Sequence, residues 1–196
     1  VGLKPRRQQD IIERMKIAAN AGVVAFTIDL DSAGRAARAT KGQTVEPKTP
    51  EQLRELVKAS PLPLFFKGIL TTDEALLCLN AGAAGIVVSN HGGRVLADEP
   101  GTAEVLPAIA DAIHGRCMIL VDGCVKRGTD VEKYIALGAD ACLAGRHFVR
   151  GAHGALADGV ELFANTIRNE LAVAMTLTGA AKVKDINRKM IRMTTP

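Results

Sequence analysis

The sequence contains no tryptophan, one tyrosine and five phenylalanines. Proteins that bind single-stranded nucleic acid stack bases on aromatic rings beside basic residues, and so few rings offer little for that purpose. The formal net charge is only +4 at pH 7, and the lysines and arginines are scattered along the chain. We therefore expect no nucleic-acid partner, although a small anionic ligand is compatible with this charge.

Cysteines with the spacing of a metal or redox site are also missing. The four cysteines, none of them in a Cys-x-x-Cys arrangement, are Cys78, Cys117, Cys124 and Cys142. Three of them lie among apolar residues, as small core residues do. We expect neither a metal site nor a disulfide.

Long hydrophobic runs are the third absence. No apolar run approaches the roughly 20 residues that a membrane-spanning helix needs. The segment from Val1 onward also lacks the charged, apolar and cleavage-site zones of a secretory signal. We therefore expect a cytoplasmic protein with no membrane partner.

The sequence does contain an alternation of amphipathic helices and short apolar strands. Its 196 residues, 47% of them apolar, are enough for one domain with a substantial core. Helical spacing, capping residues and glycine stops predict helices at 8–20, 49–58, 72–81, 102–113 and 129–137. Apolar runs predict strands at 23–28, 63–66, 85–88, 118–121 and 141–144.

This alternation implies an α/β fold with a parallel sheet, because parallel neighbours need a crossover the length of a helix. Two architectures are compatible with it. A doubly wound open sheet can be complete with five strands, whereas a closed β/α barrel needs eight strands and about 250 residues. The strand count alone favours the open sheet.

The segment after the third predicted strand is the most informative part of the chain. Ile86-Val87-Val88 predicts a strand covered on both faces, and the residues from Ser89 to Arg94 then place a histidine and an arginine among glycines. In a β/α barrel, this end of the strands carries the chemistry. Taken alone, a strand-end histidine is equally compatible with a hydrogen-bonded core residue.

Several further motifs follow in order along the chain. They are Lys67-Gly68-Ile69, Ser89-Asn90-His91-Gly92-Gly93-Arg94, the run from Asp122 to Val131, and Gly145-Arg146. Together they resemble the FMN-dependent α-hydroxy-acid oxidases and dehydrogenases, the family of glycolate oxidase, lactate oxidase and flavocytochrome b2. The similarity runs in register from about Thr27 to Leu177, which makes it far more specific than a single glycine-rich motif.

The resemblance implies a TIM-type (β/α)8 barrel, of which this chain carries about the last five β/α units. Residues 1–196 are then the C-terminal portion of a single FMN-binding barrel domain, with its first strands absent. Such a portion leaves two unpaired parallel edges, which natural proteins avoid. We therefore expect a fragment, or a subunit completed by the missing barrel segment or by homo-oligomerisation.

The resemblance also implies catalytic residues. His91 matches the base that removes a proton from a small 2-hydroxy acid as an electron pair passes to the flavin, and an imidazole suits this task near neutral pH. Asp29 matches an aspartate that hydrogen-bonds the histidine, and a turn aspartate is the alternative. Arg94 matches the arginine that binds the substrate carboxylate, for which a planar guanidinium is suited, although an arginine after a strand is often merely solvated.

FMN is the cofactor that the resemblance implies. Thr27 matches a threonine that contacts the flavin, Ser89 belongs to the flavin-binding motif, and Lys67 matches the lysine beside the N1–C2 edge of the ring. The residues that match the phosphate end are Asp122, Gly123, Lys126, Gly145 and Arg146. Backbone N–H groups, a helix start and cations would bind a generic phosphate ligand equally well.

The chain departs from the family at the phosphate end. Cys124 stands where the family usually has a glycine, Lys126 replaces an arginine, and His147 replaces a proline, so we expect weakened FMN binding. Arg35 and Arg38 are the candidates for a second substrate-binding arginine. Two alternatives therefore stay open: a module that binds flavin or phosphate without oxidase activity, and a chain that is active only after the barrel is completed.

Overall fold

The computed structural model describes residues 1–34, 44–113 and 115–193. The chain divides into two compact units, unit 1 from Val1 to Ile119 and unit 2 from Leu120 to Pro196. The candidate arginines Arg35 and Arg38 lie outside the described residues. Each unit is built from parallel strands that alternate with helices.

Unit 1 contains a parallel sheet whose strands neighbour one another in chain order. Its strands are β1 (Gly2–Leu3), β2 (Phe26–Asp29), β3 (Leu64–Ile69) and β4 (Gly85–Val88). The first residue of β5 (Met118–Val121) continues this sheet, because the backbone N–H of Met118 donates to the carbonyl of Ala84 at 3.2 Å. All four residues of β4 are buried, which confirms the prediction of a strand covered on both faces.

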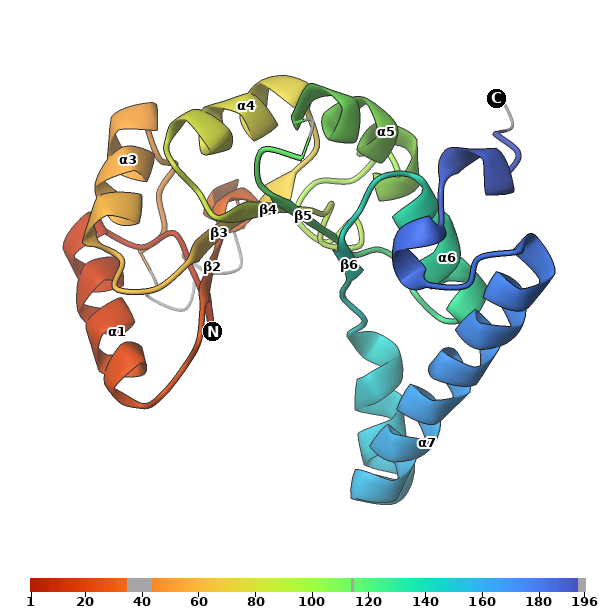
Figure 1. The fold of residues 1–196 in the computed structure, drawn as a ribbon. Helices are drawn as coiled ribbons and strands as arrows, with labels where there is room; N and C mark the ends of the chain where they lie inside the picture. The colour runs from red at the N-terminus through yellow and green to blue at the C-terminus, as the bar shows by residue number, and fades with distance from the viewer. Residues whose placement is uncertain (35–43, 114, 194–196) are drawn as a thin grey trace. The chain divides into compact units, whose positions relative to one another are not determined.

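The helices of unit 1 cover one side of these strands (Figure 1). They are α1 (Gln8–Asn20), α3 (Pro50–Ala59), α4 (Thr72–Asn80) and α5 (Thr102–Ile113), and the 3-10 helix η1 (Leu30–Gly34) follows β2 directly. Thr49 and Thr71 each accept a backbone N–H from the third helical residue and complete a capping box, so the sequence itself fixes where α3 and α4 begin. Phe26, Phe66 and Ile86 of these strands are fully buried.

Unit 2 pairs the end of β5 with β6 (Ala141–Cys142), and α6 (Gly128–Ala136) connects the two strands. After β6 the chain continues into α7 (Arg146–Thr178), η2 (Val183–Asp185) and η3 (Arg188–Met190). Ala155 and Leu156 in α7 have non-helical backbone angles, so α7 is two helices joined by a kink. Among the described residues, no helix has the length and apolar character needed to cross a membrane.

The structure corrects several predicted boundaries. β1 was not predicted, because a two-residue strand has no periodicity to detect. β3 extends through Lys67 to Ile69, past the predicted end at Phe66, with a register shift where Gly68 has a φ of +93°. α7 lies beyond the last predicted helix; it begins at Arg146 and has its kink at Ala155 and Leu156.

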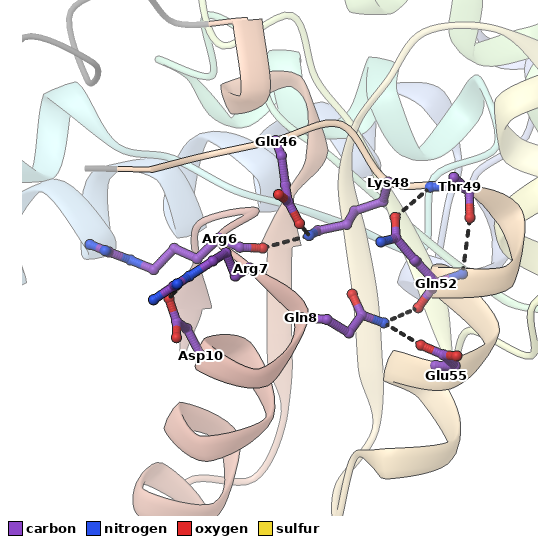
Figure 2. A network of polar contacts seen from close by, with 9 residues as sticks. All are labelled: Arg6, Arg7, Gln8, Asp10, Glu46, Lys48, Thr49, Gln52 and Glu55. Carbon is purple, nitrogen blue, oxygen red and sulfur yellow. Dashed lines mark hydrogen bonds and ion pairs between the residues drawn. The ribbon is translucent and has the colours of Figure 1, made fainter. Parts of the chain in front are cut away.

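A polar clamp joins the start of the chain to the segment that precedes α3 (Figure 2). The Lys48 ammonium donates to the carbonyl of Arg6 at 2.5 Å and pairs with Glu46 at 2.8 Å. Only 1% of the Lys48 side chain is exposed, and the backbone N–H of Glu46 donates to the carbonyl of Pro5 at 2.8 Å. Gln8 extends the clamp to α3, where its amide donates to the carbonyl of Gln52. These bonds fix the direction of the chain just after β1.

We expect Lys48→Met to lower the free energy of unfolding by about 1.5–3 kcal/mol, because hydrogen bonds from a nearly buried charged donor are lost. Arg54→Met is the control. It removes a cation from an ion pair with Glu51 in which both side chains are more than half exposed, and such pairs contribute little. Equal urea midpoints for Lys48→Met and the unmodified protein would show that the contacts of Lys48 do not stabilise the fold.

Candidate active site

In unit 1 the predicted site residues lie at the carboxyl ends of three neighbouring parallel strands. Asp29 ends β2 and is the Cα partner of Lys67 in β3, and Lys67 is in turn the partner of Val87 in β4. Ser89 and His91 follow β4 directly. Because the strands are parallel and in register, these side chains meet at one edge of the sheet.

Ser89 links the lysine to the histidine. Its fully buried hydroxyl accepts a hydrogen bond from the Lys67 ammonium and another from the backbone N–H of His91, the latter at 3.1 Å. His91 has a φ of +53°, a left-handed conformation that is uncommon for a residue with a side chain. Ser89 thus fixes both the ammonium of Lys67 and the backbone that presents the imidazole.

The structure gives His91 a different carboxylate from the predicted one. Its Nδ1 lies 2.8 Å from Oδ2 of Asp31, in η1, and the two side chains are only 16% and 11% exposed. Asp29, which we expected to make this hydrogen bond, instead forms an ion pair with Lys4. The physical reason is the turn into η1, which carries the chain past the strand end and brings a second aspartate to the imidazole.

Lys4 is a site residue that the sequence did not reveal. It follows β1, so its ammonium reaches Asp29 at the end of the neighbouring strand. The pair is largely buried, with 27% of the Lys4 side chain and 9% of the Asp29 side chain exposed. A lysine after a recognised strand end would have been a candidate, but β1 is too short to be recognised from its sequence.

The other two predicted residues of unit 1 are Thr27 and Arg94. Thr27 lies in β2 and is partly buried, opposite Gly2 in the register of β1 and β2. Arg94 is exposed in the turn segment that follows His91. Their predicted contacts with flavin and substrate stay predictions.

A third carboxyl group, that of Glu99, lies in the segment after His91. Burial raises its pKa above the ordinary glutamate value, the charges of Asp31 and Glu74 raise the pKa further, and His91 lowers it. Its Oε2 is buried without a hydrogen-bond partner among the described residues. Glu99 therefore adds an acid group with a raised pKa beside the pair of Asp31 and His91, and no motif pointed to it.

We expect Glu99→Gln to stabilise the protein at neutral pH and not in acid. A glutamate with a raised pKa destabilises the fold once it ionises, so the effect is absent below the ordinary value of 4.5 and grows as pH rises through the folded-state pKa. Urea midpoints at pH 7 and pH 4 measure it. Glu161→Gln, at an exposed position of α7, is the control, and a gain at pH 4 as large as at pH 7 would contradict the assignment.

In unit 2 the predicted phosphate residues lie on two loops, and the loop after β5 is held by its own helix. The hydroxyl of Tyr134 donates to the carbonyl of Gly123 at 2.8 Å. Asp130 accepts the backbone N–H groups of Lys126 and Arg127, each at 3.0 Å. Because Asp130 already binds these donors at the start of α6, the loop offers an anion mainly its exposed cationic side chains.

The loop after β6 leads straight into α7. Gly145 is the N-cap residue of this helix, and among the described residues other than its chain neighbours no heavy atom lies within 4 Å of the place where its Cβ would stand. Arg146 follows with an exposed side chain. Backbone N–H groups at the start of a helix and an adjacent guanidinium are suited to a phosphate group, so this loop fits the predicted ligand.

The exposed cysteine of the loop after β5 differs from two cysteines that are more buried. Cys124, in the loop after Asp122, is exposed and has a φ of +53°, the left-handed region that a glycine adopts without strain. Burial raises the pKa of Cys78 and of Cys142 to about 12, which makes these thiols poor nucleophiles. Within the part of the chain that the structure describes, no group of acidic, histidine or cysteine side chains could hold a metal ion.

Comparisons with known proteins identify the family of the chain. A model of the FMN-dependent dehydrogenase family matches residues 3–193. L-lactate oxidase of Lactobacillus jensenii is 42% identical over 154 residues, which are 79% of this chain and 37% of that protein. A peroxisomal (S)-2-hydroxyacid oxidase of Arabidopsis thaliana is 43% identical over 142 residues, 72% of this chain and 38% of that protein. The chain spans less than two fifths of the length of these relatives.

A solved structure gives the same result for the fold. A mandelate oxidase variant with a monooxide FMN adduct is 36% identical, with a TM-score of 0.87 over 95% of this chain and 60% of that chain. With the parallel strands and alternating helices, this similarity confirms the predicted β/α-barrel class, of which the chain supplies part. The open sheet that the strand count favoured is wrong.

Proposed function

Because the chain belongs to the FMN-dependent dehydrogenase family, we propose that its protein oxidises a small 2-hydroxy acid to the 2-oxo acid with FMN as cofactor. The observation that carries this proposal is the cluster at the strand ends of unit 1. There a histidine paired with a carboxylate lies next to a lysine, and Ser89 contacts both. The relatives named as lactate and 2-hydroxyacid oxidases support the substrate class.

Each unit, taken by itself, contains residues that suit one part of FMN. In unit 1 the Lys67 ammonium, held by Ser89, is a cation that favours added negative charge on a flavin ring. In unit 2 Gly145 leaves open space at the start of α7, where Arg146 and the backbone donors suit a phosphate. Lys126 adds a further cation, and Asp122 and Gly123 supply the backbone before it.

FMN supplies the acceptor for the electron pair that leaves the substrate. The Nδ1 of His91 is engaged by Asp31, so Nε2 is the atom that takes a proton from the substrate, either from the hydroxyl or from the α-carbon. The carboxylate of Asp31 then stabilises the imidazolium that forms. Arg94 binds the substrate carboxylate through its planar donor fork.

The setting of this activity is part of the same proposal. We infer that the protein works in the cytoplasm and that the barrel is completed by the missing segment, with a homo-oligomer as the alternative assembly. The short coverage of the relatives' length supports the need for completion. Cys124 and Lys126 motivate a second candidate, a module that binds flavin or phosphate without oxidising a substrate.

We expect His91→Ala in the FMN-loaded protein to lower the rate of flavin reduction by roughly 10²–10⁴-fold, the usual contribution of a positioned general base. FMN affinity should stay the same, because the proposed cofactor contacts come from other residues. Anaerobic mixing with L-lactate or glycolate, followed by the visible flavin absorbance, measures the rate. His153→Ala, at an exposed position of α7, is the control. Unchanged flavin reduction in His91→Ala would contradict the proposed base.

The phosphate end can be tested without any turnover. Lys126→Met removes a charge-assisted contact of about 1.5–3 kcal/mol, so FMN affinity should fall roughly ten- to hundredfold. Riboflavin, which lacks the phosphate, should bind the variant and the unmodified protein equally well. Lys133→Met, at an exposed position of the same helix region, should affect neither ligand. Equal losses for FMN and riboflavin would show that Lys126 does not contact the phosphate.

A further inference from the structure

Two aspartates compete for the same role at the edge of the sheet in unit 1. Asp29 ends β2 and has the position that the family resemblance assigns to the partner of the histidine. Its carboxylate, however, is only 9% exposed and is held by Lys4. The polar clamp around Lys48 fixes the backbone that follows Lys4, so the direction of this lysine is set by several bonds.

Asp31 makes the bond that Asp29 was expected to make. Its Oδ2 lies 2.8 Å from Nδ1 of His91, and both side chains are largely buried. A bond of this length with little exposure to water orients an imidazole more strongly than a solvated pair does. Asp31 thus has the geometry of a positioning residue and Asp29 does not.

The backbone of β3 is shaped around the Asp31 carboxylate. Gly68 has a φ of +93°, and a Cβ at this position would come within 2.5 Å of the Asp31 Cγ. The register shift of β3 against β4 lies at this glycine, between Lys67 and Ile69. The regular pairing of β3 with β4 is therefore interrupted next to the Asp31 carboxylate. This irregularity is a second, independent observation that assigns Asp31 to the site.

We propose that Asp31, and not Asp29, is the residue that positions His91, while Lys4 and Asp29 form a separate structural ion pair. The carboxylate of Asp31 accepts a hydrogen bond from Nδ1–H of His91, which fixes the imidazole tautomer and leaves the lone pair of Nε2 available to the substrate. The role in turnover rests on the proposed function, but the tautomer of His91 does not. Lys4 keeps Asp29 from competing for the imidazole.

The test compares Asp31→Asn with Asp29→Asn in the FMN-loaded protein. We expect Asp31→Asn to lower the rate of flavin reduction by roughly 10²–10⁴-fold, the range seen when an orienting carboxylate is neutralised. Asp29→Asn should lower this rate less than tenfold, and Asp31→Glu, which keeps the charge, should recover part of it. A loss in Asp29→Asn as large as in Asp31→Asn would overturn the proposal.

A spectroscopic measurement separates this inference from the proposed function. In ¹⁵N-labelled protein, the imidazole signals of His91 report which nitrogen carries the proton, and a His91→Ala sample identifies them. The tautomer should change in Asp31→Asn and persist in Asp29→Asn, even if no hydroxy acid reduces the flavin. An absence of flavin reduction in the unmodified protein would contradict the proposed function alone. An unchanged tautomer in Asp31→Asn would contradict the inference alone.

Gly68→Ala provides a second route to the same bond. The added methyl group displaces the Asp31 carboxylate, so the His91 tautomer should shift as in Asp31→Asn. Gly22→Ala is the matched control, because Gly22 also has a positive φ, of +84°, but nothing lies within 4 Å of its added Cβ. A tautomer shift in both alanine variants, or in neither, would overturn the argument that β3 is shaped around Asp31.

Discussion

The parallel register of β2, β3 and β4 is the constraint on which the site in unit 1 depends. It pairs Asp29 with Lys67 and Lys67 with Val87, so the residues that follow each strand emerge at one edge. The fully buried Phe26 and Ile28 of β2 fix this register, because a slip of one residue would move both side chains to the opposite face of the sheet. The chemistry is thus placed by strand packing before any ligand binds.

At this edge of the sheet, each charged or ionisable side chain of the cluster is held by a hydrogen bond or an ion pair with a neighbour. Lys4 neutralises Asp29, Ser89 holds Lys67, and Asp31 binds His91. Buried charges are costly unless they are paired, so each contact also stabilises the fold. Glu99 is the exception, since burial and neighbouring carboxylates raise its pKa. The site therefore combines paired groups with one carboxyl group whose pKa is raised.

Much of the fold followed from the sequence, because the capping boxes at Thr49 and Thr71 and the apolar run of β4 are local. The segment containing Ser89 and His91 was predicted at a strand end for the same reason. The partner of His91 was not predictable, because the choice between Asp29 and Asp31 depends on the turn into η1 and on a lysine from a distant, two-residue strand. Non-local contacts of this kind leave no periodicity in the sequence.

The most direct test of the account is anaerobic titration of the FMN-loaded full polypeptide with L-lactate, glycolate and mandelate, monitored by visible absorbance. We predict that at least one of these acids bleaches the bound flavin and that one 2-oxo acid forms per flavin reduced. Bound flavin that stays oxidised with all three acids, while a chemical reductant still bleaches it, would contradict the proposed oxidation of 2-hydroxy acids.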